Sequence, residues 1–155
     1  MKEMKGKADF KVVNPVCPGG CGDNISLENM FEHIDSCSYM AFDEIHLKLN
    51  TEVSVDGEYH KIVYKLEESR DWFITKIWYV NGKDVFYIMH HSEEETKDVF
   101  YYNFKYFEDD VYIKSGTVRC APMGISPEDA VRNNFTTNIR DNWQLKNIKF
   151  TMYKA

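Results

Sequence analysis

The sequence predicts a mainly β protein, in which a small finger made of a cysteine knuckle and one helix precedes an antiparallel β-sandwich of about eight strands with one short helix. Three observations support this fold class. Apolar residues recur with a period of two over most of the chain after residue 41, which is typical of strands with one buried face. An Asn81-Gly82 pair joins two β-rich runs and indicates a hairpin. Three of the four cysteines cluster with a histidine within residues 17–37.

The composition excludes several classes of protein. The 155 residues are 43% hydrophobic and 15% aromatic, so the chain can bury a core without disulfide cross-links. Acidic residues outnumber basic ones by 25 to 19, and the net charge of −6 disfavours a nucleic-acid binder or a polybasic membrane reader. No run approaches the roughly 18 apolar residues of a membrane span, and the first ten residues lack the apolar block of a signal peptide. We therefore expect a cytoplasmic protein, with the nucleus as the alternative.

The clustered side chains have the spacing of a metal site. Cys17, Cys21, His33 and Cys37 form the pattern C-x3-C-x11-H-x3-C. Zinc prefers four nitrogen or sulfur ligands, which proteins supply as two close pairs joined by a longer loop. Glycines beside the first two cysteines permit a tight turn. The sequence therefore predicts that these four side chains bind one Zn²⁺, and the alternative is a chance cluster of buried cysteines with a surface histidine.

A short helix supplies the second half of this finger. Ser26 is expected to cap a helix that starts at Leu27, and apolar residues then recur at the spacing of one helical face. His33 and Cys37 lie one turn apart on it. Residues 17–37 contain acidic residues but no Lys or Arg, which argues against contacts with DNA phosphates. The expected apolar stripe consists of Leu27, Met30, Phe31 and Ile34.

Strands account for most of the remaining chain. Ser115-Gly116 is expected to form a turn between two of them, and Ser126 is expected to cap a helix of about two turns with Pro127 in its first position. The predicted division is a flexible basic tail at 1–13, a zinc finger at 14–40 and a β-sandwich at 41–155. The strands are expected at 45–49, 61–66, 72–80, 85–89, 100–106, 111–113, 117–120 and 148–152.

These motifs resemble the substrate-binding half of the seven-in-absentia (SIAH/SINA) family of RING-type ubiquitin ligases, which has two small zinc fingers and a TRAF-like antiparallel sandwich. The finger Cys17-Pro-Gly-Gly-Cys21…His33…Cys37 is similar to the second finger of that family. Asp43-Glu44-Ile45-His46-Leu47 is similar to its first sandwich strand. The run Val85 to Met89 with Val99 to Phe107 is similar to its central hairpin, and Ile125 to Ala130 falls where that family has a short helix.

The resemblance implies a zinc-binding module that captures extended peptide segments of target proteins, for ubiquitin-dependent degradation, as a two-fold homodimer. Only Cys120 lies outside the finger cysteines, so a RING cannot be built from this chain, and ubiquitin transfer would require a RING-bearing partner. The alternative is a TRAF-type signalling adaptor or decoy that acts outside ubiquitination. Whether the chain is a fragment of a longer ligase or a stand-alone relative stays open. By position, the peptide groove would involve Met40, Ile62, Val63 and Tyr64.

Other reactive side chains have simpler interpretations. His90-His91, with Glu93, Glu94 and Glu95, is expected to be a solvated tip between two strands. Cys120 is expected to be a buried structural cysteine, because a nucleophilic thiol needs a nearby base and an electropositive setting. No common catalytic motif is present, so no catalytic residue is predicted. A metal-dependent hydrolase would need an open position on the metal, which four protein ligands would close.

Overall fold

The computed structural model describes residues 12, 14–19, 21–37, 43–55, 62–67, 69–80, 82–92, 98–108, 111–139 and 148–155. The described part is mainly β, with short helical segments at Leu27–Asn29 (η1, a 3-10 turn), Met30–Ser36 (α2) and Pro127–Arg132 (α3). Its strands are β1 (Asp43–Leu47), β2 (Glu52–Val55), β3 (Ile62–Leu66), β4 (Asp71–Val80), β5 (Lys83–Ser92), β6 (Phe100–Glu108), β7 (Val111–Arg119), β8 (Ala121–Pro122), β9 (Thr137–Ile139) and β10 (Ile148–Lys154).

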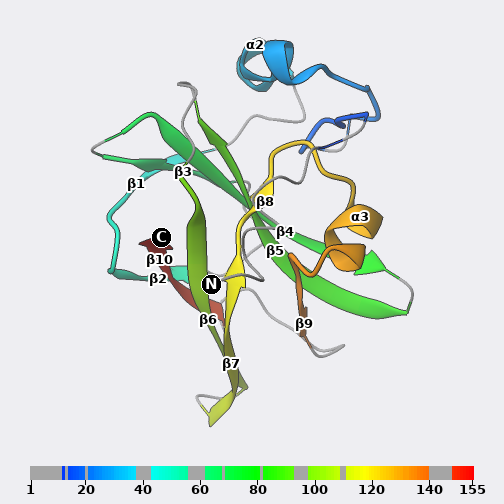
Figure 1. Ribbon diagram of the computed structural model, residues 1–155. Coiled ribbons are helices and arrows are strands. Elements are labelled where there is room, and N and C mark those ends of the chain that lie inside the picture. The colour runs from blue at the N-terminus through cyan, green and yellow to red at the C-terminus, as the bar shows by residue number, and fades with distance from the viewer. Residues whose placement is uncertain are drawn as a thin grey trace.

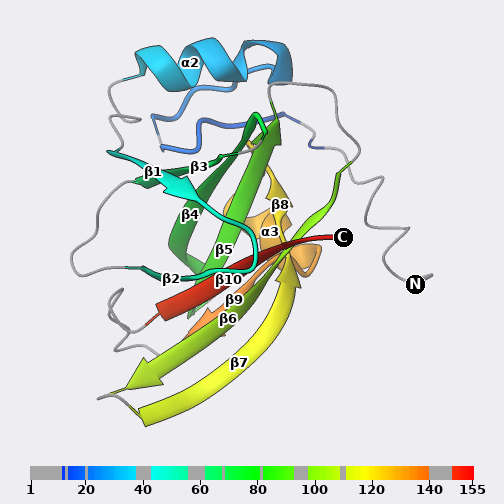
Figure 2. The ribbon, with the colours of Figure 1, turned by 90° about the vertical axis from the view of Figure 1, so that its left-hand side faces the viewer.

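The strands form two sheets, which confirms the predicted mainly β architecture (Figure 1). The first sheet has the order β1-β3-β4-β5-β8, with β9 also paired to β5, and the second has the order β2-β10-β6-β7. Figure 2 shows the long β6–β7 ribbon of the second sheet, with β10 running beside β6. Two pairings depart from the expected antiparallel pattern, because β1 with β3 and β5 with β8 are parallel. In both cases the chain forms one or two strands of the second sheet before it returns to pair with the first sheet. The residue pattern of a strand does not reveal such a crossover connection.

The space between the sheets is filled by side chains that alternate along the strands. Along β6, Tyr102, Phe104 and Tyr106 are buried, whereas the residues between them are partly exposed. Aromatic rings meet edge to face across the layers, as in the Phe86–Tyr102 pair with centroids 5.9 Å apart. Such a pair contributes about 0.5–1.5 kcal/mol beyond its buried area. The second sheet thus has one packed face and one solvated face, as its alternation predicts.

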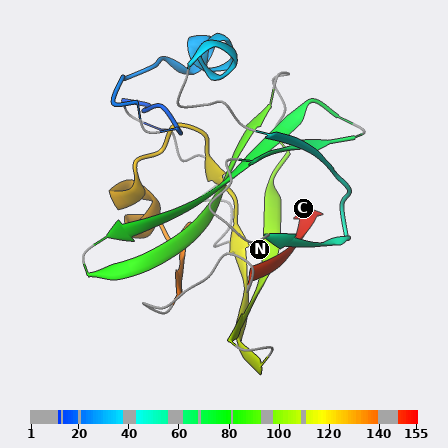
Figure 3. The same ribbon diagram turned by 180° about the vertical axis from the view of Figure 1, so that it is seen from behind.

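The first sheet differs because both of its faces are covered. Five consecutive residues of β5, from Val85 to Met89, are buried. Phe86 and Ile88 belong to the core between the sheets, whereas Val85, Tyr87 and Met89 belong to a second core on the opposite face. This second core includes residues of the N-terminal segment and of α3, which lie on the same side of the sheet (Figures 1 and 3). The molecule is therefore layered, with helical elements, the first sheet and the second sheet in turn.

Two local predictions about β7 and the β4–β5 hairpin had different outcomes. The hairpin is confirmed, because β4 and β5 pair up to Val80 and Lys83, and Gly82 has a φ of +82°. The turn predicted at Ser115-Gly116 is wrong, since β7 runs through both residues opposite β6. Gly116 does not adopt a positive φ, so nothing at this position forces the strand to turn.

His90 and His91 lie in a strand, and the prediction that they form a solvated tip is wrong. The β4–β5 ladder extends to the Asp71–Ser92 pair, which places both histidines within β5. Nε2 of His90 donates to Oδ1 of Asp71 at 2.6 Å, and Ser69 Oγ donates to the other carboxylate oxygen at 2.5 Å. The Asp71 side chain is only 2% exposed. Glu93, Glu94 and Glu95 lie outside the described residues.

The pair of Asp71 and His90 makes the free energy of unfolding depend on pH. Burial alone raises the pKa of the Asp71 carboxyl, but hydrogen bonds from His90 and Ser69 and the charge of His90 outweigh it, so the pKa lies below its usual value of 3.8. As the pH falls, the unfolded chain therefore takes up the proton before the folded one does. The contribution of Asp71 is complete above about pH 3.8 and is lost as the pH falls through the folded-state pKa.

We expect Asp71→Asn to lower the free energy of unfolding by about 1–3 kcal/mol at neutral pH, because the half-buried His90 loses an ionised acceptor. Urea titrations at several pH values would measure this. The gap between the variant and the original chain should narrow below about pH 3.8. Asp98→Asn, which removes an exposed pair with Lys154 at 3.1 Å, should cost under about 1 kcal/mol. An equal loss in both variants would contradict a special role for Asp71.

Candidate metal centre

The first half of the centre is a small hairpin. Val16 and Asn24 form an antiparallel bridge, and Cys17 donates its backbone N–H to the carbonyl of Asp23 at 3.1 Å. The N–H of Ile25 reaches the carbonyl of Pro15 at 2.8 Å. These bonds hold the two limbs together, so the turn between them presents Cys17 and Cys21 side by side. We refer to residues 14–37 as the finger.

The second half is the helix α2. Cys37 is its C-cap residue and leaves the helix in an extended conformation, while its N–H bonds to the carbonyl of His33 at 2.8 Å. His33 and Cys37 thus lie one turn apart, as the spacing predicts. Met30 and Ile34, from the predicted apolar stripe, are buried, and the side chains of Leu27 and Phe31 lie outside the described part.

The predicted cap of this helix is wrong in detail. Ser26 precedes the 3-10 turn η1, and its backbone carbonyl accepts the N–H of Asn29 at 3.0 Å. Asn29 occupies the N-cap position of α2 without a side-chain hydrogen bond. A tight 3-10 turn satisfies the first donors here in place of a capping hydroxyl.

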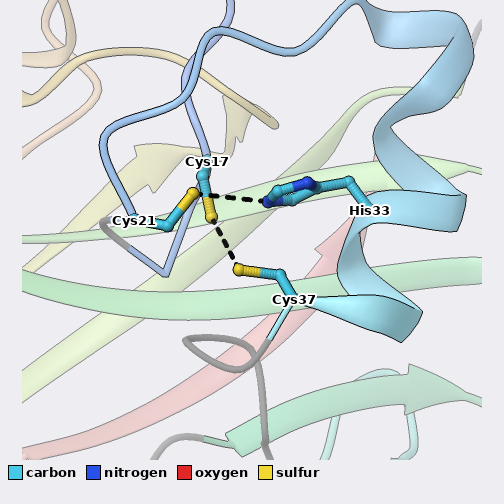
Figure 4. A group of neighbouring side chains, drawn as sticks. All are labelled: Cys17, Cys21, His33 and Cys37. Atoms are coloured by element: carbon cyan, nitrogen blue, oxygen red, sulfur yellow. Dashed lines mark hydrogen bonds between the residues drawn. The ribbon is translucent and has the colours of Figure 1, made fainter.

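Four ligand atoms converge between these halves (Figure 4). The Sγ atoms of Cys17 and Cys37 are 3.9 Å apart, and Cys21 Sγ lies 3.6 Å from Nε2 of His33. All four ligand atoms lie within 4.8 Å of one another. Cys17 is buried, and the other three side chains are half-buried. The structure therefore brings together the four residues that the sequence singled out, in a group that can hold one metal ion.

The finger is attached to the first sheet by contacts that sequence reasoning missed. The N–H of Val16 donates to the carbonyl of Gly124 at 2.8 Å, in the loop between β8 and α3. Nζ of Lys76, on β4, donates to the carbonyl of Pro18 at 2.9 Å. Met30 and Ile34 share the second core with strand residues of the sheet. Each of these contacts joins segments far apart in the sequence, and spacing alone gives no sign of them.

The residues proposed for a peptide groove are placed differently from the prediction. The side chains of Val63 and Tyr64 are 4% and 1% exposed, and they fill the second core and the core between the sheets, respectively. The strand β3 that contains them is flanked by β1 and β4, so it is not an edge strand. This corrects the expectation that Val63 and Tyr64 contact a peptide. Met40 and the side chain of Ile62 lie outside the described residues.

Cys120 is separate from this cluster. Its Sγ is buried in the core between the sheets and lies 3.5 Å from Sδ of Met152. Burial raises the pKa of the Cys120 thiol well above its usual value, and the charge of Arg119 opposes this effect without cancelling it. A neutral thiol is a poor nucleophile. The structure thus agrees with the interpretation of Cys120 as a structural residue.

Comparisons with known proteins give no family for this chain. No protein-family model matches it, and no curated protein matches it significantly. In the described ranges, no helix has the length and apolar character needed to cross a membrane.

We expect Gly124→Ala to weaken the attachment of the finger. Gly124 has a φ of +88°, and an added Cβ would lie 2.9 Å from Cβ of Pro15 and 3.0 Å from Cε of Met30. The strain and the overlap should together cost about 2–4 kcal/mol, measured by thermal or urea unfolding. Gly116→Ala is the matched control, because an added Cβ there meets nothing within 4 Å. Similar losses in the two variants would contradict the proposed close contact.

Proposed function

We propose that Cys17, Cys21, His33 and Cys37 bind one structural Zn²⁺. Zn–S and Zn–N bonds of about 2.3 and 2.0–2.1 Å place two sulfurs of a regular tetrahedron about 3.8 Å apart, and a sulfur and a nitrogen about 3.6 Å apart. The two ligand–ligand distances of 3.9 and 3.6 Å support this geometry. Thiolate and imidazole ligands in a tetrahedron favour zinc over the harder cations magnesium and calcium.

The arrangement supports a structural role for the ion. Four protein ligands complete a tetrahedral shell and leave no position for water or substrate, whereas catalytic zinc sites keep one position open. Zinc would join the hairpin, which supplies Cys17 and Cys21, to the helix end, which supplies His33 and Cys37. Met30 and Ile34 of the finger pack in the core shared with the first sheet. Because these residues pack outside the finger itself, metal binding would provide much of the folding energy of the finger.

We further propose that the chain is a zinc-stabilised protein-interaction module, which captures extended peptide segments of target proteins along a sheet edge. The single observation that supports this best is a closed Cys3His cluster that shares a core with a two-sheet β structure. The same combination underlies the resemblance to the substrate-binding half of SIAH-type ubiquitin ligases. A homodimer and a RING-bearing partner belong to the proposal through that resemblance.

The open edges of the two sheets could supply the binding surface. Among the described strands, β1 and the two-residue β8 end the first sheet, and β2 and β7 end the second one. β7 is the longest of these end strands, and Val111 and Tyr112 at its start are 61% and 54% exposed. An edge strand offers unpaired backbone groups to an added strand, and neighbouring pockets choose its side chains. A TRAF-type adaptor would bind peptides at a sheet edge in the same way. Ubiquitination of a bound target in the presence of a RING-bearing partner would distinguish a role in degradation from a role as an adaptor.

Zinc binding is tested by metal analysis of the purified chain. We expect one zinc per chain in the original protein and none after Cys21→Ser or His33→Ala. Loss of the ion should lower the unfolding temperature by about 10 °C, because the finger stabilises the sheet that it covers. Cys120→Ala is the matched control, since it should retain the zinc. Full zinc content in both ligand variants would reject this assignment of ligands.

Peptide capture is tested by selecting decapeptides from a phage-displayed library on the zinc-loaded chain and measuring their dissociation constants. If the peptide adds as a strand, N-methylation at alternate peptide residues should weaken binding roughly tenfold, because only every second N–H faces the sheet edge. N-methylation at the intervening residues should have little effect. A uniform response along the peptide, or no enriched peptide at all, would contradict strand addition.

A further inference from the structure

A zinc-loaded finger would have an unbalanced charge. A dipositive ion bound by three thiolates and a neutral imidazole has one net negative charge. Asp23, Glu28 and Glu32 add acidic groups on the exposed surface of the finger. Residues 17–37 contain no Lys or Arg. Any cation that compensates the centre must therefore come from another part of the chain.

Lys76 of β4 is the residue that meets this need. Its Nζ donates to the carbonyl of Pro18 at 2.9 Å, and Pro18 lies between Cys17 and Cys21 in the turn that supplies two of the thiolates. The lysine is half-buried, and its ammonium group also lies 4.8 Å from the centroid of the Trp78 ring. This second contact helps to hold the side chain in one orientation. A positive charge is thus fixed beside the knuckle by the first sheet.

We propose that Lys76 is the charge-compensating and positioning partner of the metal centre. This inference depends on the zinc site proposed above. The ammonium group lies beside a centre that would have a net negative charge with zinc bound, so it favours the loaded state by charge attraction. Its hydrogen bond also fixes the backbone of the knuckle, and groups that orient metal ligands in this way typically change metal affinity by about 10- to 100-fold.

The alternative role for Lys76 is packing alone, in which its aliphatic stem covers part of the sheet beside Trp78. The two roles make different predictions for isosteric variants. Lys76→Gln retains a donor for the Pro18 carbonyl and removes the charge, whereas Lys76→Arg retains the charge. Lys76→Met retains most of the stem and removes both polar features. A packing role would therefore tolerate Met better than a role in charge compensation would.

The experiment measures zinc affinity by competition with a chromophoric chelator, at low and at high salt. We expect affinity roughly 10-fold weaker for Lys76→Gln, up to roughly 100-fold weaker for Lys76→Met, and close to the original for Lys76→Arg. The difference in zinc affinity between Lys76→Gln and the original chain should be smaller at high salt, because screening weakens the interaction of charges. Lys65→Gln is the control, since Lys65 also lies over a tryptophan, at 4.3 Å from the centroid of the Trp72 ring, and its Nζ pairs with Glu44, which lies outside the finger, at 2.9 Å.

The outcomes separate this inference from the proposed zinc site. If the original chain binds no zinc, the zinc site itself is wrong. If it binds one zinc and Lys76→Gln binds zinc equally tightly, the zinc site stands and the role of Lys76 is rejected. Unfolding temperatures in excess chelator give a second readout: charge compensation predicts little change in the metal-free variants. An equal loss of stability in the metal-free and loaded states would show a packing role and overturn the inference.

Discussion

The contact between the finger and the first sheet is the constraint on which much of the structure depends. β5 has five consecutive buried residues, from Val85 to Met89, and such a strand is stable only if both faces of its sheet are covered. The second sheet covers one face, and the finger together with α3 covers the other. The buried apolar side chains described in the finger, Met30 and Ile34 among them, belong to the core that it shares with the sheet. Each part therefore supplies the surface that the other needs.

This mutual dependence sets the consequence of metal loss. Burying a side chain such as Met30 or Ile34 stabilises the fold by about 1.5–3 kcal/mol, but only while the hairpin and α2 keep their relative positions. The four ligand side chains come from these two elements, so an ion bound there would fix that geometry. Without the ion, the finger would unfold and expose part of the apolar face of the first sheet. We expect the exposed face to lower the stability of the sheet and to promote aggregation.

The sequence predicts features that depend on local spacing and misses features that depend on long-range pairing. Alternation predicts the strand around Phe104, and the C-x3-C…H-x3-C spacing predicts the four ligands, because each pattern is complete within a short segment. The parallel pairing of β5 with β8 arises only because the chain returns to the first sheet after β6 and β7, and the His90–Asp71 bond forms because the β4–β5 ladder extends beyond the two apolar runs. The same holds for Lys76 and Gly124, whose importance comes from contacts with the finger. Val63 lies in a short apolar run, which does not reveal whether its strand is at an edge or inside a sheet.

The layering also restricts where a partner could bind and how metal could affect that binding. In the described residues, both faces of the first sheet and the inner face of the second sheet are occupied, so a partner that adds to or lies on a sheet would use a sheet edge or the polar outer face around Lys105 and Lys149. The four candidate metal ligands come from the finger and not from the described edge strands. Metal would therefore influence partner binding through stability, and its effect should be larger at β1, in the sheet that the finger covers, than at β7 in the other sheet. For a partner that adds to a sheet edge, a strong dependence of its binding on zinc would favour β1 as its site, and a weak dependence would favour β7.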